Sequence, residues 1–324
     1  MRTSFAIGVD VGGTRIAVGL VERKGRVVKD AKRFTPKSGP FAVVDSIIDL
    51  VDEVTSGTHA SEIAGVGIGI PGQVDFSRQS IEFCTNLPLA GVDVRSLVMS
   101  RVKSEVTIDN DGNLAALGEA RYGAAKGARD FIMITVGTGV GGGIFLGGEP
   151  FRGSRGLGAE VGHVVVQMDG PVCPCGGKGH IESYLGRPAI AAKGRAAADT
   201  FRGREILAAA GGELDAVTAE SVLIAATSGD EVARDILLEC GDVLGRSLVG
   251  FVNVFNPALI CIGGGIGEAA DFMVERAAEV MQAEALAGRR DVSVSQAVLG
   301  NDAGILGAAA MAFDEHDSRE GLSR

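Results

Sequence analysis

The sequence predicts an α/β protein made of two copies of one arrangement, with a cleft between the copies. Its 324 residues suit two domains of roughly 100–200 residues each. Strand-like apolar runs alternate along the chain with segments of helical periodicity. The opening pattern of strand, glycine turn and strand at residues 5–21 returns at 131–146, with the turn at the same offset. We therefore expect a duplicated α/β fold.

The first half of the chain begins with a continuous β-branched run at residues 5–11, which ends at two glycines. A second strand at 15–21 and a turn at Lys24 and Gly25 give strand, turn, strand, turn, strand. Apolar residues spaced i, i+3, i+4 predict an amphipathic helix over residues 40–54. The remaining elements predicted for this half are strands at 63–70 and 106–108 and a helix at about 112–122.

The second half repeats the opening with strands at 131–136 and 144–146 around a glycine-rich break. Its other predicted elements are helices at 187–198, 219–226 and 230–253, strands at 258–262 and 292–299, and a small-residue helix at 303–313. The polar tail at 314–324 is expected to be frayed.

Composition narrows the classes of function. The chain carries 31 basic and 41 acidic residues, a net charge of -10, which argues against a broad electrostatic surface for nucleic acid. The N-terminus has no signal-peptide apolar block, and the apolar stretches are too short to span a bilayer. Five dispersed cysteines, an odd number, argue against a disulfide framework. We expect a cytoplasmic protein with no membrane partner.

Three glycine loops follow strands, at residues 10–14, 137–143 and 263–267. Glycines allow positive φ and bare the backbone N–H groups, which can then cradle phosphate oxygens. None of the loops matches a P-loop or a dinucleotide fingerprint. One such loop alone is typical of a hairpin turn, but three of them, two carrying Thr14 and Thr138, favour a nucleoside triphosphate held between two lobes. Asp10, at the mouth of the first loop, could orient Mg²⁺ through water.

Asn110 and Asp111 lie where a predicted strand meets a predicted helix. One interpretation is an ordinary N-cap, because Asn and Asp are preferred there. The alternative is that Asp111 takes the proton from a substrate hydroxyl as it attacks a phosphoryl group, while Asn110 holds the substrate.

Residues 158–182 contain the most specific cluster of chemically reactive side chains in the sequence. Cys173, Cys175 and His180 have C-x-C-x₄-H spacing, and His163 precedes the first cysteine by ten residues. Four N/S groups so close together suit a tetrahedral, closed and therefore structural zinc site. The competing interpretation is two loop cysteines and two unrelated histidines. Glu160 and Glu182 flank the cluster as carboxylates that a zinc knuckle could aim into the cleft.

With these motifs in view, the chain resembles the ROK family of repressors and sugar kinases, within the hexokinase–actin superfamily. The resemblance rests on DVGGTRIAVGL, GVGIGIPGQVD, TNLPL, DNDGNLAALGEARYG, TVGTGVGGGI, GLGAEVGHVVV, CPCGGKGHIES, CIGGGIGE and NDAGILGAAA, which together extend from residue 7 to residue 310. It implies a two-lobed, actin/hexokinase-like (ribonuclease H-like) fold with the active site in the interlobe cleft. The implied lobes are residues 1–118 with 302–324, and 119–301, the latter carrying the zinc knuckle (163–180) and oligomer contacts.

The resemblance also implies roles for individual residues. Asp111 matches the catalytic base, and His163 would bind zinc through one ring nitrogen and face the sugar with the other. The sugar-binding positions are Gly72, Asn86, Asn110, Asp111, Glu160, His163 and Glu182. The nucleotide positions are Asp10, Gly12, Gly13, Thr14, Thr138, Gly139, Gly263, Gly264 and Gly265. Two departures are His180, where the family has a fourth-ligand Cys, and Gly112, which replaces an Ala.

The activity implied is transfer of the ATP γ-phosphoryl group to a hexose, with Mg²⁺ and a structural Zn²⁺, by a homodimer or homotetramer. We expect glucose as the substrate. The alternatives are kinases of N-acetylmannosamine, N-acetylglucosamine, fructose or allose, polyphosphate as donor, and a non-catalytic sugar sensor. Repressors of the family carry a DNA-binding domain ahead of the first glycine motif, and because that motif begins here at Asp10, we expect no such domain.

Overall fold

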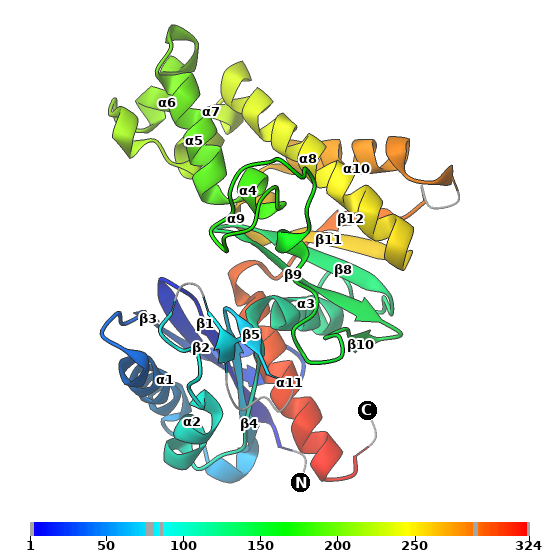
Figure 1. Cartoon of the computed structure of the whole chain (residues 1–324). Helices are drawn as coiled ribbons and strands as arrows, with labels where there is room; N and C mark the ends of the chain where they lie inside the picture. Colours follow the sequence, from blue (N-terminus) through cyan, green and yellow to red (C-terminus); the bar gives the residue numbers. More distant parts are fainter. Residues whose placement is uncertain (1–2, 76–80, 85–86, 288–290, 323–324) are drawn as a thin grey trace. The chain divides into compact units, whose positions relative to one another are not determined.

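Two five-stranded sheets of the same topology form the framework of the protein (Figure 1). The computed structural model describes residues 3–75, 81–84, 87–287 and 291–322. The strand orders are β3-β2-β1-β4-β7 and β10-β9-β8-β11-β12. In each sheet the first strand has the next two on one side and two later strands on the other. The duplicated α/β fold predicted from the repeated opening is confirmed.

The first sheet joins an antiparallel meander to parallel strands. Its members are β1 (Phe5–Val11), β2 (Arg15–Glu22), β3 (Val27–Phe34), β4 (Ile63–Ile70) and β7 (Val106–Asn110). β1 pairs antiparallel with β2 and parallel with β4, and β4 pairs parallel with β7. The parallel strands β4 and β7 are buried along nearly their whole length because both faces of the sheet are covered. Gly72 and Asp111 therefore follow neighbouring strands at one edge.

The second sheet repeats this arrangement. Its members are β8 (Phe131–Val136), β9 (Val140–Leu146), β10 (Glu149–Pro150), β11 (Leu259–Gly263) and β12 (Ser293–Gln296). β11 pairs parallel with both β8 and β12, and β10 pairs antiparallel with β9. A further two-stranded sheet joins β5 (Gln73–Val74) and β6 (Ile81–Phe83). The glycine loops at 137–139 and 263–265 thus follow adjacent strands, β8 and β11.

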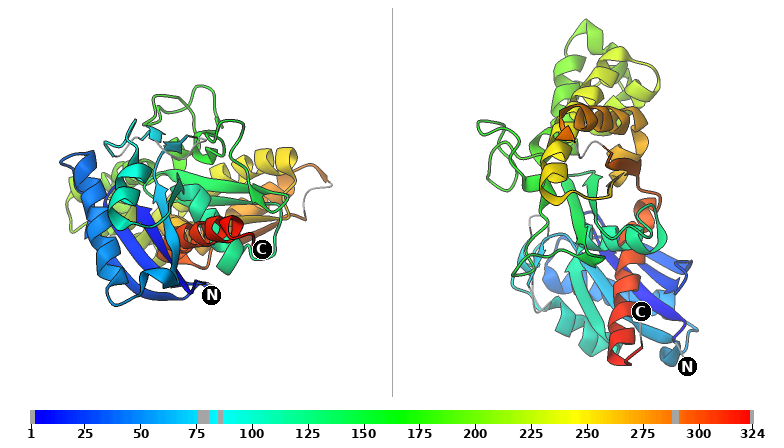
Figure 2. Two further views of the ribbon diagram at one scale, coloured as in Figure 1. Left: turned by 90° about the horizontal axis from the view of Figure 1, so that it is seen from below. Right: turned by 90° about the vertical axis from the view of Figure 1, so that its right-hand side faces the viewer.

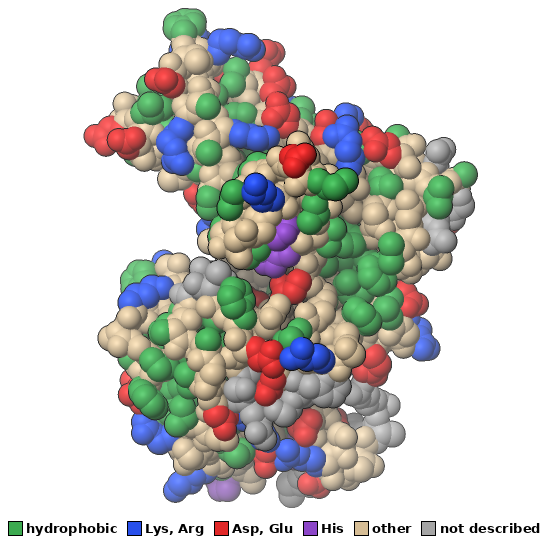
Figure 3. Space-filling view, viewed as in Figure 1, with side chains coloured by type: hydrophobic (Ala, Val, Ile, Leu, Met, Phe, Trp, Pro, Cys, Tyr) green, Lys and Arg blue, Asp and Glu red, His purple; other side chains and the backbone are tan. Residues whose placement is uncertain are grey.

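Eleven α-helices are described. They are α1 (Pro40–Thr55), α2 (Val94–Val102), α3 (Asp111–Tyr122), α4 (Glu182–Leu185), α5 (Arg187–Ala198), α6 (Arg204–Ala209), α7 (Ala219–Thr227), α8 (Glu231–Phe255), α9 (Gly264–Ala269), α10 (Asp271–Glu284) and α11 (Ala303–Arg319). Among these described helices, none has the length and hydrophobicity needed to cross a membrane. On the face shown in Figure 3, Lys and Arg side chains are scattered among Asp and Glu in the described part of the surface.

The chain forms two compact units. One contains Met1–Arg129, Gly143–Ala159 and Asn301–Arg324, and the other contains Asp130–Gly142 and Glu160–Gly300. In the first unit, α11 lies against β1 and β4, where a Cβ at Gly8 or Gly67 would overlap the backbone of the helix. Strand β1, near the start of the chain, and α11, near its end, thus lie side by side in this unit (Figure 2). Glycine on the sheet therefore allows the returning C-terminal helix to pack at backbone distance.

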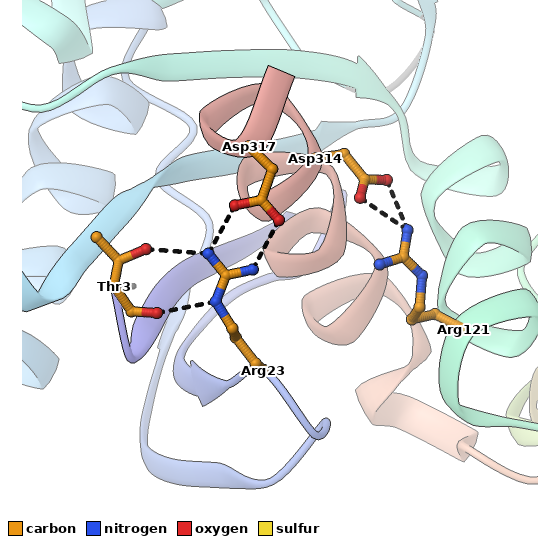
Figure 4. Close-up of polar contacts among 5 residues, drawn as sticks. All are labelled: Thr3, Arg23, Arg121, Asp314 and Asp317. Atoms are coloured by element: carbon orange, nitrogen blue, oxygen red, sulfur yellow. Dashed lines mark hydrogen bonds and ion pairs between the residues drawn. The ribbon is translucent and has the colours of Figure 1, made fainter. Parts of the chain in front are cut away.

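The C-terminal helix is longer than the sequence predicted. The prediction of a frayed tail from residue 314 was wrong, because α11 continues to Arg319. Asp314 accepts hydrogen bonds from Arg121 on α3, and Asp317 accepts a bidentate pair from Arg23 (Figure 4). These polar residues are anchored by partners far away in the chain.

Candidate active site

A hydrogen bond joins two of the predicted sugar-binding positions, Asn110 and Gly72. Oδ1 of Asn110 accepts a hydrogen bond from the Asn113 N–H at 3.1 Å, so Asn110 is the N-cap of α3, as one interpretation predicted. Its Nδ2 donates to the Gly72 carbonyl at 2.9 Å. Gly72 has φ 146°, and a Cβ there would overlap the Phe83 carbonyl. The capping bond and this second bond together fix the amide at the start of the helix.

Asp111 follows as the first residue of α3, and its Oδ1 accepts a hydrogen bond from the Gly112 N–H at 2.9 Å. Burial raises the pKa of Asp111, and backbone hydrogen bonds partly oppose that rise. At the end of β1, burial and the negative charge of Asp111 raise the pKa of Asp10 to about 7. The two carboxylates therefore interact electrostatically, which suits a proton acceptor beside a residue that orients a cation.

Residues 35 and 37 donate hydrogen bonds to the backbone of the first glycine loop. The Thr35 N–H donates to the Thr14 carbonyl at 2.9 Å, and its hydroxyl donates to the Gly12 carbonyl at 2.7 Å. The Lys37 ammonium donates to the Gly13 carbonyl at 2.6 Å. Three carbonyls are thereby directed to one side, and a cation stands at the loop. Both features suit a loop that binds an anion.

A buried ion pair precedes the catalytic candidate. Asp109, on β7, accepts a hydrogen bond at 2.8 Å from Nε of Arg152 and one at 3.2 Å from the Asn113 amide. Asp109 and Arg152 belong to the lining of a pocket of about 210 Å³. The lining residues are Val74, Asp75, Asp109, Pro150, Arg152, Gly153 and Gly156. Arg152 belongs to no chemical motif, and sequence reasoning missed it.

The structure brings the four predicted zinc ligands together. One ligand atom from each of His163, Cys173, Cys175 and His180 lies within 4.8 Å of the others. Nδ1 of His163 is 3.7 Å from Sγ of Cys173, and Nδ1 of His180 is 3.3 Å from Sγ of Cys175. Zn–S and Zn–N bonds place tetrahedral ligand atoms about 3.3–3.8 Å apart, so the set fits zinc. Burial raises the pKa of the Cys173 thiol to about 11, and a bound cation would have to displace that proton.

A tight hairpin presents the two cysteines. The Cys173 N–H donates to the Gly177 carbonyl, and the Gly176 N–H donates back to the Cys173 carbonyl, each at 2.8 Å. Gly176 takes φ 92° and Gly179 takes φ 66°, where a side chain would be strained. The glycines of the motif thus form the knuckle, as the spacing predicted.

Glu182 lies between the knuckle and the second glycine loop. Its Oε2 accepts a hydrogen bond from the Val140 N–H at 2.9 Å, and its Oε1 is 3.5 Å from Sγ of Cys173. A Cβ at Gly139 would collide with this carboxylate, so a larger residue there would displace the Glu182 side chain. Sequence reasoning expected Glu182 at the sugar and missed its bond to the loop, although its position two residues after His180 implied a place beside the knuckle.

The remaining sugar-binding candidates are Glu160, His163 and Asn86. The Glu160 carbonyl accepts a hydrogen bond from the His163 N–H at 3.1 Å, which places both residues in one 3₁₀ turn. Ala159, directly before Glu160, has φ 67°, a strained conformation for alanine. Asn86 lies outside the described residues.

The third glycine loop opens a helix. Gly263 is the N-cap of α9, and Gly264, at φ 81°, donates its N–H to Oε1 of Glu268 at 3.2 Å. In the same unit, the backbone N–H of Arg187 donates to the Gly137 carbonyl at 3.0 Å. The start of α5 thus contacts the second glycine loop, which contains Thr138 and Gly139.

Comparison with known proteins gives consistent matches along the chain. The model of the ROK family matches residues 6–315. A glucokinase from Streptomyces coelicolor is 36% identical over 312 residues, which cover 95% of this chain and 97% of the relative. A ROK family glucokinase from Streptomyces griseus, crystallised in complex with glucose and AMPPNP, is 33% identical with a TM-score of 0.87, covering 96% of this chain and 99% of that one.

A xylose repressor from Caldicellulosiruptor bescii is 28% identical over 313 residues, which cover 95% of this chain and 78% of the repressor. Kinases and a repressor thus align over nearly the whole chain, the glucokinases at higher identity. The family match, the glucokinase identities and the shared two-sheet fold confirm the resemblance seen in the glycine, DNDGN and CPCGGKGH motifs. The chain belongs to the ROK family.

Proposed function

We propose that this protein is an ATP-dependent hexose kinase that transfers the γ-phosphoryl group to the 6-hydroxyl of glucose. The observation that carries the proposal is the partly buried Asp111 carboxylate at the first turn of α3, directly after the Asn110 amide bound to Gly72. Full-length similarity to glucokinases, one of them crystallised with glucose and AMPPNP, supports both the donor and the sugar.

Phosphoryl transfer requires positioning, charge neutralisation and one proton acceptor. Asp111 accepts the proton of the sugar hydroxyl while that oxygen forms a bond to the γ-phosphorus. The bond from the γ-phosphorus to the β–γ bridging oxygen breaks, and ADP leaves. Asn110, Gly72, Asn86, Glu160, His163 and Glu182 hold the sugar hydroxyls in this proposal. Mg²⁺ bound with ATP would neutralise phosphate charge, and Asp10 would help to hold it.

Zinc has a structural role in this proposal. His163, Cys173, Cys175 and His180 would hold it, and a closed set of four protein ligands leaves no open position for catalysis. The ion would cross-link the knuckle and fix the position of Glu182 beside Cys173. Through Nδ1 of His163, it would leave the other ring nitrogen for the sugar. We further propose that the protein assembles as a homodimer or homotetramer.

A sugar-sensing protein without catalysis is the second candidate, favoured by the similarity to a xylose repressor. Such a protein needs sugar-binding residues but no proton acceptor. Asp111, Asp10 and the threonine-bearing glycine loop around Thr14 together favour the kinase, because a sensor needs neither a proton acceptor nor a phosphate-binding loop.

Replacement of Asp111 by Asn tests the proposal. We expect kcat to fall about 10²–10⁴-fold, because the general base is lost while the amide keeps the size of the carboxylate. Glucose affinity, measured by calorimetry, should change little. Near-normal turnover by the variant would remove Asp111 from the mechanism. A wild-type protein that binds glucose but transfers no phosphoryl group would favour the sensor.

A further inference from the structure

The side chain of Arg187 lies over the third glycine loop. A Cβ built on Gly265 would stand 3.1 Å from Nη2 of Arg187, so the guanidinium covers this exposed glycine. The backbone N–H of the same residue is bound to the Gly137 carbonyl, and a Cβ on Gly186 would lie 3.3 Å from the Thr138 carbonyl. The start of α5 therefore contacts both glycine loops of this unit.

A negative charge also lies at this loop. Glu268 accepts a hydrogen bond from the Gly264 N–H, so a carboxylate lies at the loop itself. A phosphate group placed against the loop would meet that like charge unless a cation stood nearby. Arg187 supplies such a cation, and its planar guanidinium can offer two parallel donors to phosphate oxygens.

Within the protein, Arg187 forms a weak ion pair with Glu220. Nε of Arg187 is 3.0 Å from Oε1 of Glu220 on α7, but the atoms lack hydrogen-bond alignment and Nε is buried without a hydrogen bond among the described residues. The two side chains are 42% and 50% exposed. An ion pair so exposed contributes little to stability. The pair thus leaves the guanidinium donors available to a stronger anion.

We infer that Arg187 is a nucleotide-contacting residue, whose guanidinium binds a phosphate oxygen of the donor at the 263–265 loop. The inference rests on the proposed function, since it assigns one contact within the ATP site. Arg187 belongs to none of the glycine motifs, so spacing in the sequence gives no signal for it. The fold places it there because Arg187 is the first residue of α5 and its backbone N–H donates to the Gly137 carbonyl.

Calorimetric titration of the full-length protein with Mg-AMPPNP and with adenosine tests this contact. Arg187→Ala should weaken Mg-AMPPNP binding about 10–100-fold, the loss typical of a hydrogen bond to a charged group, and leave adenosine binding unchanged. Arg187→Lys should recover part of the affinity, because it restores the charge without the planar fork. Lys193→Ala is the matched control, since Lys193 lies on the same helix and pairs with Glu239. It should bind both ligands as the wild type does.

Glu220→Ala separates the inference from a purely structural role. Suppose instead that the ion pair only stabilises the packing of α5 on α7. Arg187→Ala and Glu220→Ala would then lower the melting temperature by the same amount and leave Mg-AMPPNP affinity unchanged. That result would overturn the inference. We expect Glu220→Ala to keep or raise that affinity, because it releases the guanidinium. An equal loss of adenosine affinity in Arg187→Ala would overturn the phosphate assignment. A wild type that binds no nucleotide would overturn the proposed function and the inference together, whereas a wild type matched by Arg187→Ala would overturn the inference alone.

Discussion

Asp10 and Asp111 are two neighbouring carboxylates whose surroundings differ. Both are partly buried, and the charge of Asp111 adds to the rise in the pKa of Asp10. Asp111 retains a hydrogen bond from Gly112, which favours its ionised form, as a proton acceptor requires. The motifs in the sequence predicted both residues, but the electrostatic coupling depends on the pairing of β1 with β4 and of β4 with β7, and it could not be predicted.

The raised pKa of Asp10 makes stability depend on pH in a defined direction. Its ordinary value is 3.8 and its value in the folded protein is about 7, so between these values the folded state binds the proton more tightly than the unfolded state. The contribution of Asp10 to stability is therefore lost progressively as pH rises from about 4 to about 7.

Asp10→Asn removes this titration. In EDTA and without nucleotide, the melting temperature of the variant relative to the wild type should increase from pH 5 to pH 7 and then level off. Differential scanning calorimetry across this range checks the expectation. An offset between the two proteins that stays constant with pH would contradict the raised pKa.

At the scale of elements, regular periodicity predicted well and long-range contacts did not. The predicted boundaries of β4 and α5 match the structure at both ends, because a buried apolar strand and a helix that starts at Arg187-Pro188 are marked locally. The helices α2 and α10 were not predicted. The end of α11 was misplaced, since Arg23 and Arg121 stabilise it from 294 and 193 residues away.

The zinc knuckle is the element whose prediction is most easily tested. Cys173→Ser and Cys175→Ser should lose the metal and lower the melting temperature, because metal binding is coupled to folding of the loop. Cys84→Ser is the control, since its hydroxyl can keep the hydrogen bond that the thiol donates to the Pro71 carbonyl. Elemental analysis should find zinc in the wild type and in the control. Its absence from the purified wild type would contradict the site.

At the scale of the molecule, Arg23 bonds to Thr3, near the start of the chain, and to α11, near its end, within the first unit. Its guanidinium donates to the Thr3 carbonyl and to Asp317, and it lies 4.5 Å from the centre of the Phe313 ring (Figure 4). No local sequence pattern marks this cluster, because its members come from opposite ends of the chain. A single side chain thus bonds both to Thr3 and to the C-terminal helix.

Asp317→Ala should destabilise the protein by about 1 kcal/mol, because Asp317 and Arg23 are only partly exposed and their pairing is bidentate. Glu315→Ala, which removes an exposed pair within the same helix, should change stability by less than about 0.5 kcal/mol. Urea denaturation at low and high salt measures both effects. Equal losses in the two variants would show that the Arg23 cluster has no special role.

The central claim is phosphoryl transfer to a hexose, and the most direct measurement is ADP release from Mg-ATP with a panel of sugars. Glucose, mannose, fructose, allose, N-acetylglucosamine and N-acetylmannosamine are supplied in turn, with the Asp111→Asn protein as the blank. The account predicts turnover with glucose, yielding glucose 6-phosphate, and its loss in the variant. No turnover with any sugar, from protein shown to contain zinc and to bind glucose, would contradict it.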